Sequence, residues 1–218
     1  MSENHVDISS LRQNYKRSSL LEDDVHPNPY QQFNQWFKEA LDSKILEPNA
    51  FSLATSTTDG FPSVRIVLLK EVKKEGFVFY TNYKSKKGKE LLENPKCSMV
   101  FFWGELERQV RVQGIASKLT HQESFAYFKT RPKESQIGAV ISPQSEIIPS
   151  REYLETKFEE SQEKYKDIRL ALPDYWGGFV IRPINFEFWQ GRESRLHDRI
   201  MYQLMPHTNE WQIIRLAP

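Results

Sequence analysis

The chain has 218 residues, of which 39% are hydrophobic and 13% aromatic, and this is enough apolar side chain for a substantial core. Its 30 Lys and Arg residues against 29 Asp and Glu residues give a formal net charge of +1, so no global field favours nucleic acid or an acidic membrane surface. The single cysteine, Cys97, excludes an internal disulfide and a cysteine-based zinc cluster, and we expect it to be a buried strand residue. No segment approaches the ~18 apolar residues of a membrane span, so we expect a cytoplasmic protein.

Residues 1–28 are polar, carry mixed charge and end in the proline-rich stretch HPNPY. We expect them to form a flexible N-terminal arm, which is a candidate lid over an active site. Residues 29–218 are expected to form one domain. Its first element should be an amphipathic helix with a proline in the first turn, because apolar side chains recur at helical spacing: Phe33, Trp36, Phe37, Ala40 and Leu41.

Strand-like segments follow this helix, and the turns TDGFP and KKEG between the first three are short enough for antiparallel neighbours. The stretch SKKGKELLENP predicts one short helix that stops at its Asn-Pro step. In the alternating segment LERQVRVQGIASKL, Val110 and Val112 face one side while Gln109, Arg111 and Gln113 face the other, which predicts a core face and a polar face. The expected strands are 51–57, 63–72, 77–82, 97–103 and 106–119.

The remaining part of the chain predicts helices and then strands again. The helices are expected at 121–132, 134–142 and 150–166, and the strands at 175–183, 185–191, 197–205 and 211–217. Many antiparallel strands with inserted helices favour an α+β protein built on a β-barrel with the helices packed around it, because barrel closure removes exposed sheet edges.

Several motifs of large enzyme classes are absent from the sequence. It has no G-x-G-x-x-G, no G-x-x-x-x-G-K-[ST], no H-E-x-x-H and no G-x-S-x-G, so dinucleotide-binding, P-loop, zinc-protease and α/β-hydrolase interpretations have no support. Four of the five histidines, His5, His26, His121 and His207, stand apart in polar surroundings. We therefore expect no metal site.

Cations stand beside aromatic residues in four segments: RIVLLK (65–70), YTNYKSKKGK (80–89), YFKTRPKES (127–135) and WQGRESRLHDRI (189–200). Each segment alone is typical of a solvated surface, since exposed ion pairs contribute little stability. Four together indicate a local anion site. A helix that begins near Ser85 with Lys86 and Lys87 in its first turn supports this, because the helix dipole already places positive partial charge there.

Strand geometry makes two further predictions about these cations. If the segment SRLHDRI is extended, Arg195, His197 and Arg199 project to one face in a cationic row. Arg65 and Lys70 are an odd number of positions apart, so they would face opposite sides of an ideal strand. Both can serve a site only if a strand end or a bulge re-aims one of them, or if they serve different parts of it.

Taken together, the chain resembles the pyridoxine/pyridoxamine 5'-phosphate oxidase family. The resemblance runs in order through LRQNY, RIVLLK, FYTNYKSKKG, LERQVRVQG, YFKTRPKESQIGA, SPQS, YWGGF, FWQGRESRLHDR and the C-terminal RLAP. It implies an FMN-binding split β-barrel, mainly antiparallel, that forms a homodimer with FMN at the subunit interface. The implied reaction converts pyridoxine 5'-phosphate or pyridoxamine 5'-phosphate to pyridoxal 5'-phosphate, with dioxygen as acceptor and hydrogen peroxide as product.

The resemblance also implies site residues. The positions that match the family's flavin-binding motifs are Arg65, Ile66, Val67, Leu68, Leu69, Lys70, Tyr80, Thr81, Lys86, Lys87, Gln109, Gln144, Ser145, Trp189 and Arg199. Those that match the substrate motifs are Arg12, Tyr15, Lys70, Tyr127, Arg131, Ser135, Arg195 and His197. Arg195 and His197 are the implied catalytic residues, and we expect positioning of the substrate before general-base chemistry from His197. Lys86 departs from the arginine that is common in the family, which keeps the charge but loses the bidentate fork that would hold the flavin.

Two other functions stay open at this point. A related split-barrel flavin oxidase, such as those of phenazine pathways, would act on another substrate, although Tyr127, Arg131 and Ser135 favour the vitamin B6 phosphates. A non-catalytic protein that binds flavin or pyridoxal phosphate is the second alternative. Nucleic-acid binding is disfavoured by the near-zero net charge and the lack of an extended basic stripe.

Overall fold

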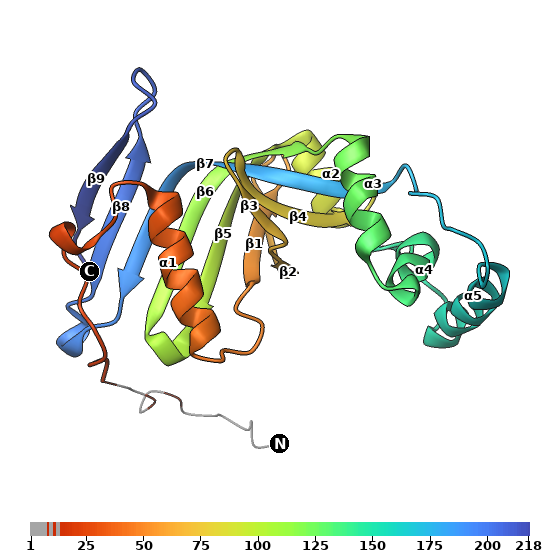
Figure 1. Ribbon diagram of the computed structural model, residues 1–218, viewed down its shortest axis with the longest axis horizontal. Coiled ribbons are helices and arrows are strands. Elements are labelled where there is room, and N and C mark those ends of the chain that lie inside the picture. Colours follow the sequence, from red (N-terminus) through yellow and green to blue (C-terminus); the bar gives the residue numbers. More distant parts are fainter. Residues whose placement is uncertain (1–7, 9–10, 12–13) are drawn as a thin grey trace, which may run out of the picture. The chain divides into compact units, whose positions relative to one another are not determined.

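The computed structural model describes residues 8, 11 and 14–218 (Figure 1). Its chain divides into two compact units. The first unit takes residues up to Pro48 together with Phe102–Val110 and Phe186–Pro218, and the second takes Asn49–Phe101 and Arg111–Asn185. Each unit is described by itself.

The second unit is built on antiparallel strands, of which β5, β6 and β7 also contain residues of the first unit. The hydrogen-bonded order is β2-β1-β5-β6-β7-β4-β3. β1 faces β2 with Leu53 opposite Arg65, and β4 faces β7 with Phe79 opposite Phe179. The bounds are β1 (Ala50–Ser56), β2 (Pro62–Leu68), β3 (Glu71–Lys73), β4 (Gly76–Asn82), β5 (Lys96–Trp103), β6 (Arg108–Lys118) and β7 (Trp176–Gln190).

Aromatic side chains on the inward positions of these strands form the core of the second unit. Phe51 contacts Phe79 edge-on at 6.2 Å and Phe101 at 5.2 Å between ring centroids. Phe79 in turn stacks on Phe179 at 5.7 Å. All four are at most 1% exposed, so this cluster supplies much of the apolar burial that holds the strands together.

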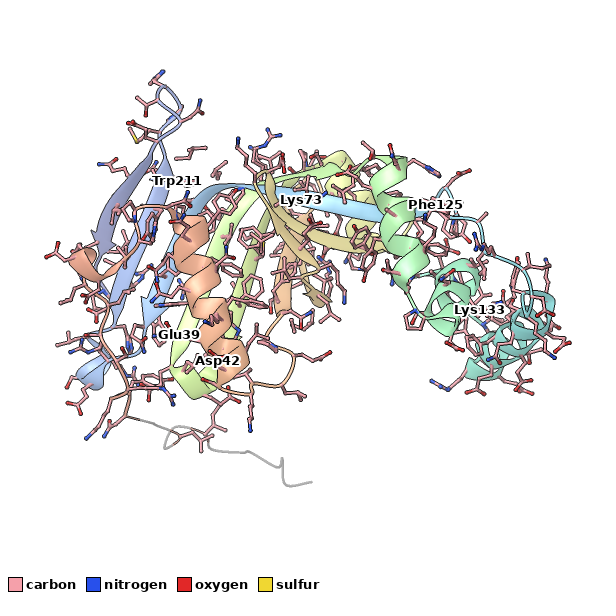
Figure 2. The ribbon with its side chains drawn as sticks, in the orientation of Figure 1. Glu39, Asp42, Lys73, Phe125, Lys133 and Trp211 are labelled. Atoms are coloured by element: carbon pink, nitrogen blue, oxygen red, sulfur yellow. The ribbon has the colours of Figure 1, made fainter. Side chains whose placement is uncertain are left out.

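The helices of the second unit begin at residues that cap them. Ser85 accepts a hydrogen bond from the Gly88 N–H at the start of α2, as expected from the sequence. Thr120 and Glu123 form a reciprocal capping box on α3, and Glu123 also pairs with Lys73 of β3 at 2.7 Å (Lys73 is labelled in Figure 2). The helices are α2 (Lys86–Glu93), α3 (His121–Thr130), α4 (Lys133–Ile141) and α5 (Arg151–Lys164).

The first unit contains the predicted amphipathic helix and the last two strands. In α1 (Pro29–Asp42) the proline occupies the first turn, and Phe33, Trp36 and Ala40 are buried as predicted, whereas Leu41 is 51% exposed. Trp36 packs edge-on against Phe188 at 5.2 Å. The strands β8 (Asp198–Leu204) and β9 (Trp211–Leu216) are antiparallel, and short 3₁₀ turns lie at Glu22–Asp24, Gly104–Leu106 and Glu193–Arg195.

Three features of the structure differ from the sequence prediction. The expected strand 63–72 breaks into β2 and β3, because the Lys70 N–H donates to Val78 O of β4 instead of continuing the pairing with β1. The expected strands 175–183 and 185–191 form one strand, β7. Pro183 is tolerated inside it because the pairing with β4 ends at Ile181, so the missing N–H breaks no bond of that ladder.

The predicted cationic row at 195, 197 and 199 is wrong. Ser194 and Arg195 adopt the left-handed region, with φ of 56° and 61°, and form a 3₁₀ turn. The strand begins only at Asp198, so strand alternation does not relate these three side chains.

Cys97 lies in β5 with 7% of its surface exposed, which confirms the expected buried strand residue. Burial raises the pKa of its thiol to about 12. Within the described residues, no helix is long and apolar enough to cross a membrane, and no group of three or more His, Cys, Asp or Glu side chains is arranged to hold a metal ion.

Gly76 should tolerate alanine far worse than Gly60. A Cβ on Gly76 would lie 1.9 Å from Ile181 O, whereas none of the chain lies within 4 Å of a Cβ on Gly60, and both have positive φ. We expect Gly60→Ala to cost about 1 kcal/mol through backbone strain and Gly76→Ala to cost about 2 kcal/mol more through overpacking. Urea denaturation of both variants measures the difference, and equal costs would contradict the close approach of β4 and β7.

Candidate functional site

The larger of two candidate sites is a cavity of about 860 Å³ in the second unit, which we call the Arg131 cavity. Of the residues that the structure describes, its lining has four cations, Arg65, Lys70, Lys87 and Arg131, and no carboxylate. The complete lining is Arg65, Ile66, Val67, Leu68, Lys70, Tyr80, Thr81, Asn82, Lys87, Tyr127, Thr130, Arg131, Pro132, Ser135, Gly138, Ala139, Ser142, Gln144 and Trp176.

The break between β2 and β3 lets Arg65 and Lys70 share this cavity. Arg65 lies within β2, and Lys70 lies in the link after β2 ends at Leu68. Side chains an odd number of positions apart face opposite sides only within one regular strand. Because the strand is interrupted before Lys70, the Lys70 side chain can face the same cavity as Arg65. The sequence predicted that a strand end or a bulge could bring both residues to one site, and the end of β2 does so here.

One end of the cavity lies at the start of α2. Lys87 Nζ donates to Thr81 Oγ1 at 3.3 Å and to Gln144 Oε1 at 3.1 Å. Burial lowers the pKa of Lys87, and the nearby charge of Arg65 lowers it further. A half-buried ammonium beside a guanidinium and a helix N-terminus is favourable for an anion and unfavourable without one.

Another part of the lining surrounds Arg131, in the link between α3 and α4. The guanidinium lies 4.7 Å over the Trp176 ring, and its Nη1 is buried without a hydrogen-bond partner in the described part of the chain. Burial also lowers the pKa of Arg131. A buried charged donor without an acceptor is costly, so this nitrogen fits a bound anionic oxygen.

Aromatic rings line the same region. Tyr80 stacks on Tyr127 at 3.8 Å between centroids, and Trp176 lies parallel to both rings at 5.6 and 6.3 Å. Burial is the main reason that the pKa of Tyr80 rises to about 12, so its phenol stays protonated and serves as a hydrogen-bond donor. Flat apolar faces beside cations suit a planar ligand that carries an anionic group.

A second cavity, of about 580 Å³, lies in the first unit, and we call it the His197 cavity. Tyr15 of the arm meets Trp189 at 5.8 Å and His197 at 5.7 Å between ring centroids. Gly191 accommodates this ring, because a Cβ there would lie 2.7 Å from the Tyr15 Cγ. The lining is Leu11, Asn14, Tyr15, Gln109, Trp189, Arg192, Ser194, Arg195 and His197.

The protonation of His197 follows from its surroundings. Its Nδ1 accepts a hydrogen bond from the Arg192 N–H at 3.1 Å. Burial lowers the pKa of His197, and the Arg195 charge lowers it further although Asp198 opposes this. A neutral imidazole whose Nδ1 is an acceptor carries its proton on Nε2. His197 therefore presents a donor at Nε2.

Asp198 fixes the segment that carries His197. Its carboxylate accepts from Arg192 Nη1, from the Leu20 N–H and from Arg215 Nη1, each at 3.0 Å. Three donors from separate segments hold both the end of the arm and the turn before β8.

The structure brings most of the predicted residues into one or the other cavity. Four of them lie elsewhere. Leu69 is buried beside the Arg131 cavity, Lys86 is exposed and 3.9 Å from Glu90, and Ser145 follows Gln144 in a loop with φ of 73°. Arg199 forms a bidentate pair with Glu187 of β7 at 2.8 and 3.0 Å. Arg12 lies outside the described residues.

Sequence reasoning missed several lining residues, of which Trp176 is the most informative. Trp176 packs in the core with 7% exposure, and it also contacts Arg131, Tyr80 and Tyr127. One feature of the sequence could have identified Trp176: it stands directly before Gly177 and Gly178, and small residues there let other side chains come close. Asn82, Thr130 and Ser142 gave no comparable signal.

Comparison with solved structures gives the class of the protein. The chain is similar to PhzG from Burkholderia lata 383, solved in complex with tetrahydrophenazine-1-carboxylic acid, with a TM-score of 0.85 and 29% identity over 91% of this chain and 98% of that one. A pyridoxamine 5'-phosphate oxidase-related, FMN binding protein from Nostoc punctiforme PCC 73102 shares the fold, with a TM-score of 0.68 at 15% identity over 89% and 99% of the two chains. The fold is therefore the split β-barrel of pyridoxamine 5'-phosphate oxidase-like proteins.

Sequence comparison then gives the family. Residues 37–165 match the family model "Pyridoxamine 5'-phosphate oxidase", and residues 176–218 match "Pyridoxine 5'-phosphate oxidase C-terminal dimerisation region". A pyridoxine/pyridoxamine 5'-phosphate oxidase from Nostoc sp. PCC 7120 is 51% identical over 97% of this chain and 98% of its own. The chain belongs to the pyridoxine/pyridoxamine 5'-phosphate oxidase family of enzymes, which confirms the resemblance seen in the sequence.

The pKa of His197 should be measurable by NMR titration of its imidazole resonances. We expect a value below the ordinary 6.5, and a rise toward 6.5 in Arg195→Gln, without reaching it because burial is the larger cause. Since the folded-state pKa is lowered, the associated stability is present above pH 6.5 and is lost as pH falls through the folded pKa. A wild-type value above 6.5 would contradict a neutral His197 that accepts at Nδ1.

Proposed function

We propose that this chain is an FMN-dependent oxidase that converts pyridoxine 5'-phosphate or pyridoxamine 5'-phosphate to pyridoxal 5'-phosphate, with dioxygen as acceptor and hydrogen peroxide as product. Membership of the family supports the reaction class. The single observation that carries the proposal is the Arg131 cavity itself: its lining has no acidic side chain among the described residues, and Arg131 Nη1 is buried with no hydrogen-bond partner among them. A planar phosphate ester matches the cations and the flat aromatic rings that line the Arg131 cavity.

The donor set fits FMN. Arg65, Lys87, Thr81 and Gln144 offer charge and hydrogen bonds to a phosphate, and the β2 backbone from Ile66 lies in the same lining. Bound FMN would accept the two electrons of the oxidation and pass them to dioxygen. The protein's own side chains bind and orient the substrate and exclude water from it.

The substrate phosphate is assigned to Lys70, Tyr127, Arg131 and Ser135. Two phosphate monoesters in one cleft each carry a charge of about −1.5 to −2 near neutral pH, so they repel each other unless cations lie between or beside them. Four lining cations offset most of that charge. The near-zero net charge of the chain thus coexists with a concentrated positive site.

A complete active site is proposed to need two copies of the chain. The match of residues 176–218 to a dimerisation region supports this, because that region contains Trp189, Arg195 and His197. We infer that the His197 cavity of a second copy joins the Arg131 cavity, so that flavin and substrate lie at the subunit interface. Gln109 and Arg199 are assigned to the flavin as well, because Gln109 lines the His197 cavity and Arg199 lies in the matched dimerisation region.

In this site Arg195 and His197 orient the substrate ring. His197 holds its proton on Nε2 and so donates a hydrogen bond to the substrate, which favours positioning over removal of a proton. Tyr15 contacts Trp189 and His197, which supports the arm as a lid that excludes water from the substrate.

The test of the reaction is spectroscopic. Purified protein should become yellow with FMN, and the flavin band should bleach on anaerobic addition of pyridoxine 5'-phosphate and return with air. A yellow protein that is not bleached would leave a non-catalytic flavin-binding protein. Bleaching by a phenazine-type carboxylic acid but by neither vitamin B6 phosphate would favour the alternative oxidase, to which the PhzG structure is similar.

Arg131→Met should raise the KM for pyridoxine 5'-phosphate by about 10- to 100-fold, because a charge-assisted hydrogen bond contributes about 1.5–3 kcal/mol. The turnover number should change less, since the phosphate lies away from the reacting carbon. Lys133→Met is the matched control, because Lys133 belongs to α4 but does not line the Arg131 cavity (Lys133 is labelled in Figure 2). Steady-state kinetics give both constants, and an unchanged KM in Arg131→Met would remove Arg131 from the phosphate site.

A further inference from the structure

We propose that Glu90 is a positioning residue for the cofactor-phosphate end of the site, where it holds the Arg65 guanidinium in place against the wall of the Arg131 cavity. The inference rests on the proposed function, because it assigns that end of the cavity to a phosphate. Glu90 itself is not part of the cavity lining, and no motif of the sequence pointed to it.

Glu90 is an acidic residue buried in α2, with 4% of its surface exposed. Its carboxylate accepts hydrogen bonds from the hydroxyls of Thr55 and Ser63, the latter at 2.6 and 2.7 Å, and from Arg65 Nη2 at 3.3 Å. Burial works against the charged carboxylate, yet the bonds from Ser63 and Thr55 and the Arg65 charge hold the pKa of Glu90 below its usual range. The group is therefore a permanent buried negative charge at neutral pH.

The Arg65 guanidinium is fully engaged on its two terminal nitrogens. Nη1 donates to Leu53 O at 3.0 Å and to Thr55 Oγ1, and Nη2 donates to Ser63 Oγ at 2.8 Å and to Glu90. These bonds account for all four Nη protons. The Nε–H is the remaining guanidinium donor, and no bond to it is seen within the described ranges.

The hydroxyls of Thr55 and Ser63 relay hydrogen bonds from the Arg65 guanidinium to the Glu90 carboxylate. Thr55 and Ser63 each accept a hydrogen bond from Arg65 and each donate one to Glu90. All three donors contact Oε2, and the Ser63 hydroxyl also contacts Oε1. A carboxamide at residue 90 would lose the negative charge that faces the guanidinium and would place an NH₂ group or a single oxygen where the carboxylate has two equivalent acceptors. Four acceptors around one planar group leave its guanidinium a single orientation.

This orientation matters because Arg65 lies close to another cation. The charge of Arg65 contributes to the lowered pKa of Lys87, so the two groups repel each other before any ligand binds. Glu90 offsets that repulsion through its ion pair with Arg65 Nη2 at 3.3 Å, and the Glu90 carboxylate is not part of the cavity lining. Both cations are thus held ready for a phosphate, and binding does not have to order them.

Three readings of Glu90 predict different results in Glu90→Gln. If Glu90 positions Arg65, FMN binds more weakly. If Glu90 is only a negative charge near an anion site, its loss strengthens FMN binding. If Glu90 only braces the fold, thermal stability falls while the affinity of the folded protein for FMN stays unchanged.

The experiment is a titration of apoprotein with FMN, followed by quenching of flavin fluorescence, and a parallel titration with riboflavin, which lacks the phosphate. We expect Glu90→Gln to raise the Kd for FMN at least 10-fold and to change the Kd for riboflavin less than 3-fold. The matched control is Glu93→Gln, one turn later in α2, whose carboxylate is bound to exposed Thr58 at 2.6 Å and does not contact Arg65. It should leave both constants unchanged.

An FMN Kd in Glu90→Gln that equals or falls below the wild-type value overturns the proposal. So does an equal loss for riboflavin, because the effect would then not concern the phosphate. Should Glu90→Gln fail to fold, Ser63→Ala removes one of the two connecting hydroxyls and should shift the FMN Kd in the same direction by a smaller factor; no shift there overturns the proposal equally. A wild-type chain that binds no FMN would instead defeat the proposed function.

Discussion

The gathering of positive charge in a cavity that none of the described carboxylates lines is the constraint on which the rest of the site depends. Lys87 and Arg131 are both partly desolvated, and burial lowers the pKa of each. Charges in such surroundings are tolerated only when hydrogen bonds, aromatic faces or a buried counter-charge compensate for lost water. The protein uses all three: Thr81 and Gln144 for Lys87, Trp176 for Arg131 and Glu90 for Arg65.

The fold supplies these compensations through interruptions in regular structure. The gap between β2 and β3 re-aims Lys70, the capped start of α2 presents Lys87, and the link between α3 and α4 presents Arg131. The backbone of each of these residues is tied to a regular element, so the segment that carries the cation is in place before a ligand arrives. In the first unit Asp198 does the same for the turn that carries Arg195 and His197.

Periodicity predicted the elements well and their interruptions poorly. The helix from Pro29, the cap at Ser85 and the buried face of Val110 and Val112 follow from local sequence, because spacing and capping are local properties. The end of β2 and the left-handed pair Ser194 and Arg195 depend on tertiary hydrogen bonds and turn geometry, which no local pattern encodes. Site residues came from the order of family motifs, and these contain neither Glu90 nor the second function of Trp176.

The burial of Cys97 has a consequence for how long such a catalyst lasts. An oxidase of the proposed kind releases hydrogen peroxide at every turnover, and peroxide attacks cysteine through the thiolate. With a pKa of about 12, Cys97 is almost entirely protonated at physiological pH, and its place in β5 keeps oxidants away from the sulfur. The only thiol in the sequence is therefore a poor target for the peroxide that the proposed reaction would release, because little thiolate forms and little of the sulfur is exposed.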